Sequence, residues 1–125
     1  MRLLEFTSVS QSDLNQVERY ADKLFAKVGL DIEFTKHFLQ RVNDTRNQKP
    51  ITSAELIRLF RQEYQKHGLT IGELPAEAEA VMKDMETDIN VPFKIVLNKD
   101  GDLELIAKTI MRKQDFKTSN QTFDV

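Results

Sequence analysis

The chain lacks several features that would define its chemistry at once. There is no cysteine among its 125 residues, which excludes disulfides, thiol nucleophiles and zinc–thiolate sites. Its longest apolar run falls far short of the roughly 20 residues that a membrane-spanning helix needs, so no membrane partner is expected. Residues 1–5 show no apolar region of the kind found in signal peptides. Together these absences predict a cytoplasmic protein.

Motifs of several common activities are missing as well. The carboxylates of residues 73–88 do not follow the spacing of a calcium-binding loop. The two histidines, His37 and His67, are too few and too far apart for a histidine-rich metal site. There is no glycine-rich phosphate loop, Gly-x-Ser-x-Gly motif or helix-turn-helix signature. We therefore expect neither a metal nor a cofactor.

What is present is the composition of an ordinary globular protein. Hydrophobic residues make up 40% of the chain and charged residues 30%, and a chain of this length can bury a core of its own. We expect a single domain over residues 1–125. The net charge of −2 argues against a basic coat for nucleic acid.

The charges are nevertheless unevenly distributed. Segment 34–50 has four basic residues against one acidic residue, and segment 91–118 has six against four. Segment 72–90 has six acidic residues against one lysine. A locally basic surface can attract a phosphate ligand on an acidic protein, although such asymmetry is also common on solvated surfaces.

Helical patterns occupy the first half of the chain, after a possible short strand at 2–9. Apolar residues on one face predict a helix that begins at a Ser10 or Ser12 cap and ends at Gly29. A capping box that starts at Thr52 predicts a longer helix, expected to end at Gly68 with His67 in its last turn.

Between them, residues 35–44 are predicted to form a shorter helix. Phe38 and its neighbours at i−4 and i+4 give it one apolar side. His37 and Arg41 are i, i+4 neighbours, and Asp44 continues their row. This row lies beside the apolar stripe, where it could rim a cleft.

Residues 69–90 are ambiguous. Pro75 would be tolerated in the first turn of a helix over 75–82, whereas a strand that begins near Ala80 is the alternative. The helical part of the domain is expected over about 10–82.

The last third predicts an antiparallel hairpin over about 91–113. A three-residue loop with Gly101 in the left-handed conformation sets Leu97 against Leu103 and Phe93 against Ala107, so that one face is apolar. A two-residue Asp-Gly turn would mix the faces, so we expect the longer loop. Thr109 and Met111 should then point to the core face. The other face should carry Lys94, Val96, Glu104, Ile106, Lys108, Ile110 and Arg112.

The polar tail, residues 114–125, is expected either to add an edge strand or to stay loose. The order of elements predicts an α+β fold, with three to four helices packed on one face of an antiparallel sheet centred on the C-terminal hairpin.

Two basic sets are candidates for chemistry. One is His37, Arg41 and Arg46; the other is Lys94, Lys108 and Arg112, expected on one sheet face. If the two sets meet, they form a cationic pocket with one imidazole, which suits RNA cleavage by proton transfer and charge stabilisation. The alternative is a surface histidine among solvated cations.

A family resemblance rests on the same residues. The stretch from Lys36 to Val42, followed by Arg46-Asn47 and a helix start at Ile51-Thr52, resembles the H-x-x-x-R opening helix of the small RelE/colicin D/barnase-like RNase and toxin superfamily. Residues 107–113 resemble late strands in which such proteins place Thr, Arg and Lys. The general style also resembles small accessory proteins of tailed bacteriophages.

The resemblance implies helices followed by an antiparallel sheet, and a site on the matching residues. His37, Arg41 and Arg112 would be catalytic, with His37 as general acid or base and the arginines on phosphate. The nucleic-acid-binding set would be Arg46, Lys94, Lys108 and Thr109.

The resulting hypothesis is a small RNase-like domain that binds RNA or cleaves phosphodiesters without a metal. The alternative is a non-catalytic phage accessory or interaction protein whose acidic 72–90 segment binds a basic protein partner. In a virus, the compartment would be the host cytoplasm. Whether the protein is an enzyme, and its oligomeric state, remain open at this point.

Overall fold

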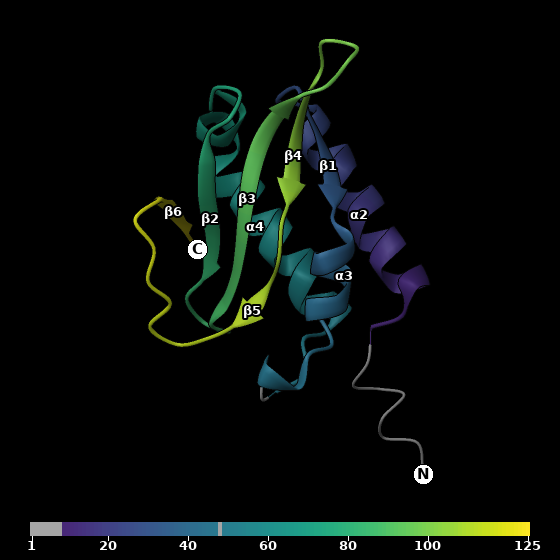
Figure 1. Ribbon diagram of the computed structural model, residues 1–125, viewed down its shortest axis with the longest axis vertical. Helices are drawn as coiled ribbons and strands as arrows, with labels where there is room; N and C mark the ends of the chain where they lie inside the picture. The colour runs from purple at the N-terminus through teal and green to yellow at the C-terminus, as the bar shows by residue number, and fades with distance from the viewer. Residues whose placement is uncertain (1–8, 48) are drawn as a thin grey trace.

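The computed structural model describes residues 9–47 and 49–125, and in this part helices lie on a mixed six-stranded sheet (Figure 1). The predicted strand at 2–9 lies outside the described residues except for Val9. The helices are α2 (Gln11–Ala26), α3 (Lys36–Arg41) and α4 (Ser53–Gly72), with a 3₁₀ turn η1 (Thr45–Asn47). The strands are β1 (Leu30–Phe34), β2 (Glu79–Asp84), β3 (Ile89–Leu97), β4 (Leu103–Ala107), β5 (Met111–Arg112) and β6 (Gln121–Asp124).

The strand order is β1-β4-β3-β2-β6, and β5 pairs with β3. β3 is antiparallel to β2, β4 and β5, whereas β1 is parallel to β4 and β6 is parallel to β2. The α+β class is confirmed, but the sheet is mixed rather than antiparallel. The described residues contain three α-helices and no fourth, and none is long and apolar enough to cross a membrane.

The predicted hairpin register is confirmed. Leu97 pairs with Leu103 and Phe93 with Ala107, and Gly101 has a φ of 84°. This register is favoured because only it places the apolar side chains of both strands on the core side of the sheet.

The predicted helix starts hold better than the predicted ends. Ser10 caps α2, and Thr52 caps α4, each in a capping box. α4 continues past Gly68 to Gly72 because its apolar face continues to Ile71, which is fully buried. Gly68 serves packing instead, since a Cβ there would lie 3.0 Å from the ring of Tyr64.

β1 was not predicted as a strand, and the segment that contains β2 was left open between helix and strand. The alternative of a helix over 75–82 is wrong, and so is the prediction that the helical part of the domain extends to residue 82. Ala80 and Met82 instead point to the core from β2. Ile32 and Phe34 belong to β1, whose buried and exposed residues alternate. The polar tail does add an edge strand, β6, anchored by the buried Phe123.

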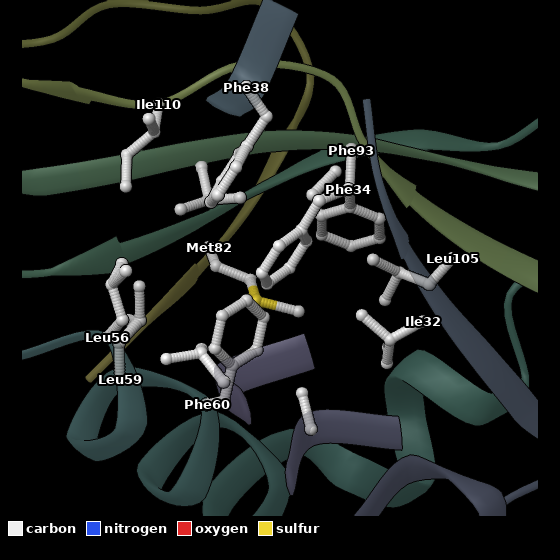
Figure 2. Packing of buried hydrophobic residues seen from close by; sticks show 14 of the residues in the cluster. Ile32, Phe34, Phe38, Leu56, Leu59, Phe60, Met82, Phe93, Leu105 and Ile110 are labelled. Carbon is white, nitrogen blue, oxygen red and sulfur yellow. The ribbon is translucent and has the colours of Figure 1, made fainter. Parts of the chain in front are cut away.

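The core between helices and sheet also holds α3 in place. Phe38 of α3 stacks on Phe34 of β1 at 4.3 Å between ring centroids, and Phe34 stacks on Phe60 of α4 at 5.7 Å. Figure 2 shows Met82 among these rings, with Ile110 beside Phe38. Because Phe38 is fully buried, its neighbours His37 and Arg41 are held at the surface of a firmly packed helix.

Candidate functional site

A cleft of about 700 Å³ opens where α3 and η1 face the chain around β5. These segments meet at one end of the molecule, at the bottom of Figure 1. The lining residues are His37, Arg41, Asp44, Arg46, Asn47, Thr109, Ile110, Met111, Arg112, Lys113 and Gln114.

The cleft brings together most of the predicted site residues. His37, Arg41 and Arg46 on one side meet Thr109 and Arg112 on the other. The predicted row of His37, Arg41 and Asp44 does rim a cleft, although α3 ends at Arg41.

Lys94 and Lys108 do not line this cleft. Lys94 pairs with Glu77 at 3.0 Å and Lys108 with Glu79 at 2.6 Å, on the sheet face turned away from the core. The prediction that Lys94, Lys108 and Arg112 share one sheet face is therefore wrong for Arg112.

A one-residue bulge separates Arg112 from the two lysines. Phe93 pairs with Ala107, but Asn90 pairs with Met111, so the later chain contains one more residue than β3 between these pairs. Such an insertion turns the following side chains to the opposite face. Ile110, predicted on the outer face, is therefore buried in the core at 1% exposure.

Pro92 accounts for the position of the bulge. The Lys108 N–H donates to the Pro92 carbonyl at 2.9 Å, but proline has no N–H to return the second bond of the pair. The hydroxyl of Thr35 donates to the Lys108 carbonyl instead, at 2.9 Å. Thr35 also caps α3 by accepting from the Phe38 N–H at 3.0 Å. One residue thus ties α3 to the bulge and brings both walls of the cleft together.

Arg112 is part of the frame of the cleft. Its Nε donates to the Lys49 carbonyl (3.1 Å) and its Nη1 to the Thr87 carbonyl (2.8 Å). Its Nη2 donates to the Pro50 carbonyl (2.7 Å) and to Glu55 Oε1 (2.9 Å). These four hydrogen bonds use most of the donors of a guanidinium, and the side chain is only 10% exposed. The geometry therefore gives Arg112 a structural role rather than the predicted phosphate contact.

Glu55 remains ionised beside Arg112. Burial alone would raise the pKa of Glu55, but hydrogen bonds from Arg112 and from Thr52 lower it below its usual value. The pair thus stays charged and joins the start of α4 to β5.

Two buried amides complete the frame, and neither was predicted to have this role. Asn47 donates to the Arg41 carbonyl (2.9 Å) and accepts from the Arg112 N–H (3.0 Å), so it spans the cleft floor. Asn90 donates to the carbonyls of Met111 (3.3 Å) and Lys113 (3.1 Å). An asparagine in a stretch rich in turn formers predicts only a turn, because its partners lie far away in the sequence.

Polar side chains that line the cleft form a chain of contacts around Asp44. Its Oδ2 accepts from Arg41 Nη1 and from Arg46 Nη2, both at 3.0 Å, and its Oδ1 accepts from Arg46 Nε at 3.1 Å. Arg41 Nε donates to His37 Nε2 at 3.3 Å. Neutral His37 therefore carries its proton on Nδ1 in this arrangement.

The charge of the cleft is positive. Four cationic side chains, from Arg41, Arg46, Arg112 and Lys113, and the carboxylate of Asp44 line it. Glu55, which does not line the cleft, neutralises Arg112. With Asp44 offsetting one further cation, two positive charges remain uncompensated by the described residues.

His67 lies elsewhere. It is inside α4 rather than in the last turn, and its Nε2 lies 2.9 Å from the Asp124 carbonyl. A carbonyl oxygen only accepts, so Nε2 carries the proton and His67 holds β6 against α4.

The cleft has the donors to hold an anion, and no group of three His, Asp or Glu side chains in the described residues could hold a metal ion. Comparison of the chain with known protein families, with curated proteins and with solved structures gave no match.

Proposed function

We propose that the protein binds RNA through its phosphate groups, in the cleft between α3, η1 and residues 109–114. The observation that carries this proposal is the convergence of His37, Arg41 and Arg46 with Lys113 around one concave surface that keeps two uncompensated positive charges. Arginine is well suited to phosphate because its N–H groups match two phosphate oxygens at once.

The frame around these side chains supports binding. Asn47, Arg112 and Thr35 join segments that are far apart in the sequence through buried or partly buried hydrogen bonds. A rigid frame reduces the entropy lost when a ligand is held, so more of the contact energy appears as affinity.

Binding is supported more directly than cleavage. Cleavage next to a 2′-hydroxyl requires one proton to be removed and another to be supplied. Among the described residues that line it, the cleft offers one imidazole, His37, and one carboxylate, Asp44, which is engaged by two arginines. Metal-independent cleavage with His37 as general acid or base stays a prediction that the same RNA can test in the presence of a chelator.

We do not extend the proposal to a basic protein partner at residues 72–90. Glu77 and Glu79 of this segment pair with Lys94 and Lys108, and Asp84 pairs with Arg58 at 2.8 Å. Glu86 also lies 3.7 Å from Arg58 Nη1, so four of the six carboxylates on which that alternative depends are engaged within the protein.

The test is a titration of a fluorescently labelled single-stranded RNA, read by anisotropy. The variant Arg41→Ala with Arg46→Ala removes two cleft cations and should weaken binding at least about tenfold, since each charge-assisted contact contributes about 1.5–3 kcal/mol. The control is Arg19→Ala with Arg61→Ala, two exposed arginines of α2 and α4 outside the cleft.

The control has the same net charge as the cleft variant, so it should bind within about twofold of the parent protein. An equal loss in both variants would mean that RNA is attracted by overall charge and not by the cleft. Circular dichroism of each variant checks that the fold is retained.

A further inference from the structure

Asp44 occupies the position of an anionic ligand within the cleft. Its two carboxylate oxygens meet Nε and Nη2 of Arg46 at 3.1 and 3.0 Å, the two-pronged contact that arginine also makes with phosphate. The same carboxylate accepts from Arg41 Nη1 at 3.0 Å. The side chain of Asp44 is 23% exposed, so a ligand in the cleft can reach this pair of arginines only beside Asp44 or in its place.

This arrangement disfavours a phosphate group with a single negative charge. An internal phosphodiester that displaced Asp44 would exchange one monoanion for another and leave the carboxylate unpaired near the phosphate. A terminal phosphate monoester carries about −1.5 to −2 charges at pH 7, because its second pKa is near 6. The interaction energy of the terminal phosphate with the arginines is therefore larger than the interaction energy that Asp44 gives up.

A phosphate that binds beside Asp44 meets the same preference. Within the part of the chain that the structure describes, two positive charges of the cleft remain uncompensated, which a dianion balances and a monoanion does not. Donors remain for it as well: within the described part of the chain, Arg41 Nη2, Arg46 Nη1 and Lys113 Nζ make no hydrogen bond.

The lining of the cleft offers little for the bases of an RNA chain. None of the described residues that line it is Phe, Tyr or Trp. Stacking on such side chains is the usual way to hold unpaired bases along a strand. Apart from the His37 ring and the guanidinium planes of the arginines, recognition in this cleft therefore depends on the phosphate group itself.

From these observations we propose that the cleft selects a terminal phosphate monoester of RNA over an internal phosphodiester, because its excess of cationic side chains favours the more highly charged group. The inference rests on the proposed function and specifies its ligand. Asp44 lowers the affinity of the cleft for either phosphate, because it occupies Arg41 and Arg46 and repels an anion that binds beside it.

The experiment compares three RNAs of one sequence, labelled internally: one with a 5′-phosphate, one with a 3′-phosphate, and one with hydroxyls at both ends. We expect at least one phosphorylated RNA to bind about tenfold more tightly than the hydroxyl-ended RNA. The two phosphorylated forms show which end is recognised. In Asp44→Asn, every RNA should gain affinity, and the ratio of phosphorylated to hydroxyl-ended affinity should stay the same or rise, because the dianion is relieved of the larger repulsion.

A second measurement needs no variant. The ratio of phosphorylated to hydroxyl-ended affinity in the parent protein should fall as pH is lowered from 7.5 to 5.5, because the terminal phosphate becomes a monoanion near its second pKa of about 6. The charged groups that face the ligand, from Arg41, Asp44, Arg46 and Lys113, and the imidazole of His37 meet both RNAs, and the hydroxyl-ended RNA measured at each pH reports any change in them.

The outcomes separate this inference from the proposed function. Equal affinity for all three RNAs, or a ratio that Asp44→Asn lowers toward one, would overturn the terminal-phosphate inference while RNA binding stands. Failure of every RNA to bind would overturn the proposed function itself, and the inference with it.

Discussion

Glu63 is a carboxylic acid of α4 that lies in the interior of the protein. It is fully buried, and neither of its side-chain oxygens has a hydrogen-bond partner among the described residues. Its pKa is raised to about 9, chiefly by burial, and the nearby Asp124 and Asp84 carboxylates act in the same direction. Glu63 is therefore neutral in the folded protein at pH 7.

This predicts that stability decreases as pH rises from about 5 to 9. The unfolded chain loses the Glu63 proton near its usual pKa of 4.5, while the folded protein keeps it until about 9. In this window the folded state binds more protons, so the free energy of unfolding falls by up to about 1.4 kcal/mol per pH unit. Urea unfolding of the parent and of Glu63→Gln at pH 5.5, 7 and 8.5 measures the slope.

Glu63→Gln should flatten this pH dependence of the free energy of unfolding. Glu73→Gln, a change at the exposed C-cap residue of the same helix, should leave it as in the parent. Comparing slopes cancels the titration of the other groups, which the variants share. A parent slope that Glu63→Gln does not reduce would show that Glu63 is ionised or hydrated in the folded state.

At the scale of elements, the free edge of β1 is protected by the helix that precedes it. Asp22 of α2 accepts from the Ile32 N–H and Glu18 from the Phe34 N–H, both at 2.8 Å. Residues one helical turn apart are about 6 Å apart, close to the spacing of alternate residues in a strand. The two carboxylates thus match two edge N–H groups that would otherwise be open to another strand.

Removing these carboxylates should destabilise the protein and expose the edge. For Glu18→Ala with Asp22→Ala we expect a loss of about 2–4 kcal/mol in the free energy of unfolding, because two N–H groups lose charged acceptors. Self-association should increase as well. Urea unfolding and analytical ultracentrifugation measure the two effects.

The matched control is Asp31→Ala with Glu33→Ala, which removes two exposed carboxylates from β1 itself. Burial and neighbouring carboxylates, including Glu104, raise the pKa of both groups, so their removal should not destabilise the fold. If both pairs of substitutions cost the same stability, the contacts to the edge N–H groups would have no special role.

The elements also show which parts of the fold follow from local patterns. The caps at Ser10 and Thr52 and the hairpin register were predictable because each depends on residues close together in the sequence. β1 and β2 were missed or left open because strands of five and six residues carry too short a pattern.

The candidate site likewise has a part that local sequence patterns predict and a part that they do not. The row of His37, Arg41 and Asp44 follows from helical spacing. The role of Arg112 could not be predicted, because a bulge turns it and its partners include Glu55, 57 positions earlier. Pro92 was a visible signal, since proline inside a central strand indicates an edge or a bulge.

Across the whole molecule, the cleft is a cationic site on a protein with a net charge of −2. Its walls come from residues 37–47 and 109–114, joined by Asn47 and Thr35. Carboxylates elsewhere repel a polyanion, so the surrounding charge should direct RNA toward the cleft.

The measurement that tests this account most directly is a titration of ¹⁵N-labelled protein with a short single-stranded RNA, followed by amide chemical shifts. We predict that the shifts concentrate in residues 36–47 and 108–114, around His37 and Arg41. Shifts centred on the outer sheet face near Lys94 and Lys108, or spread evenly over the molecule, would contradict the cleft as the binding site.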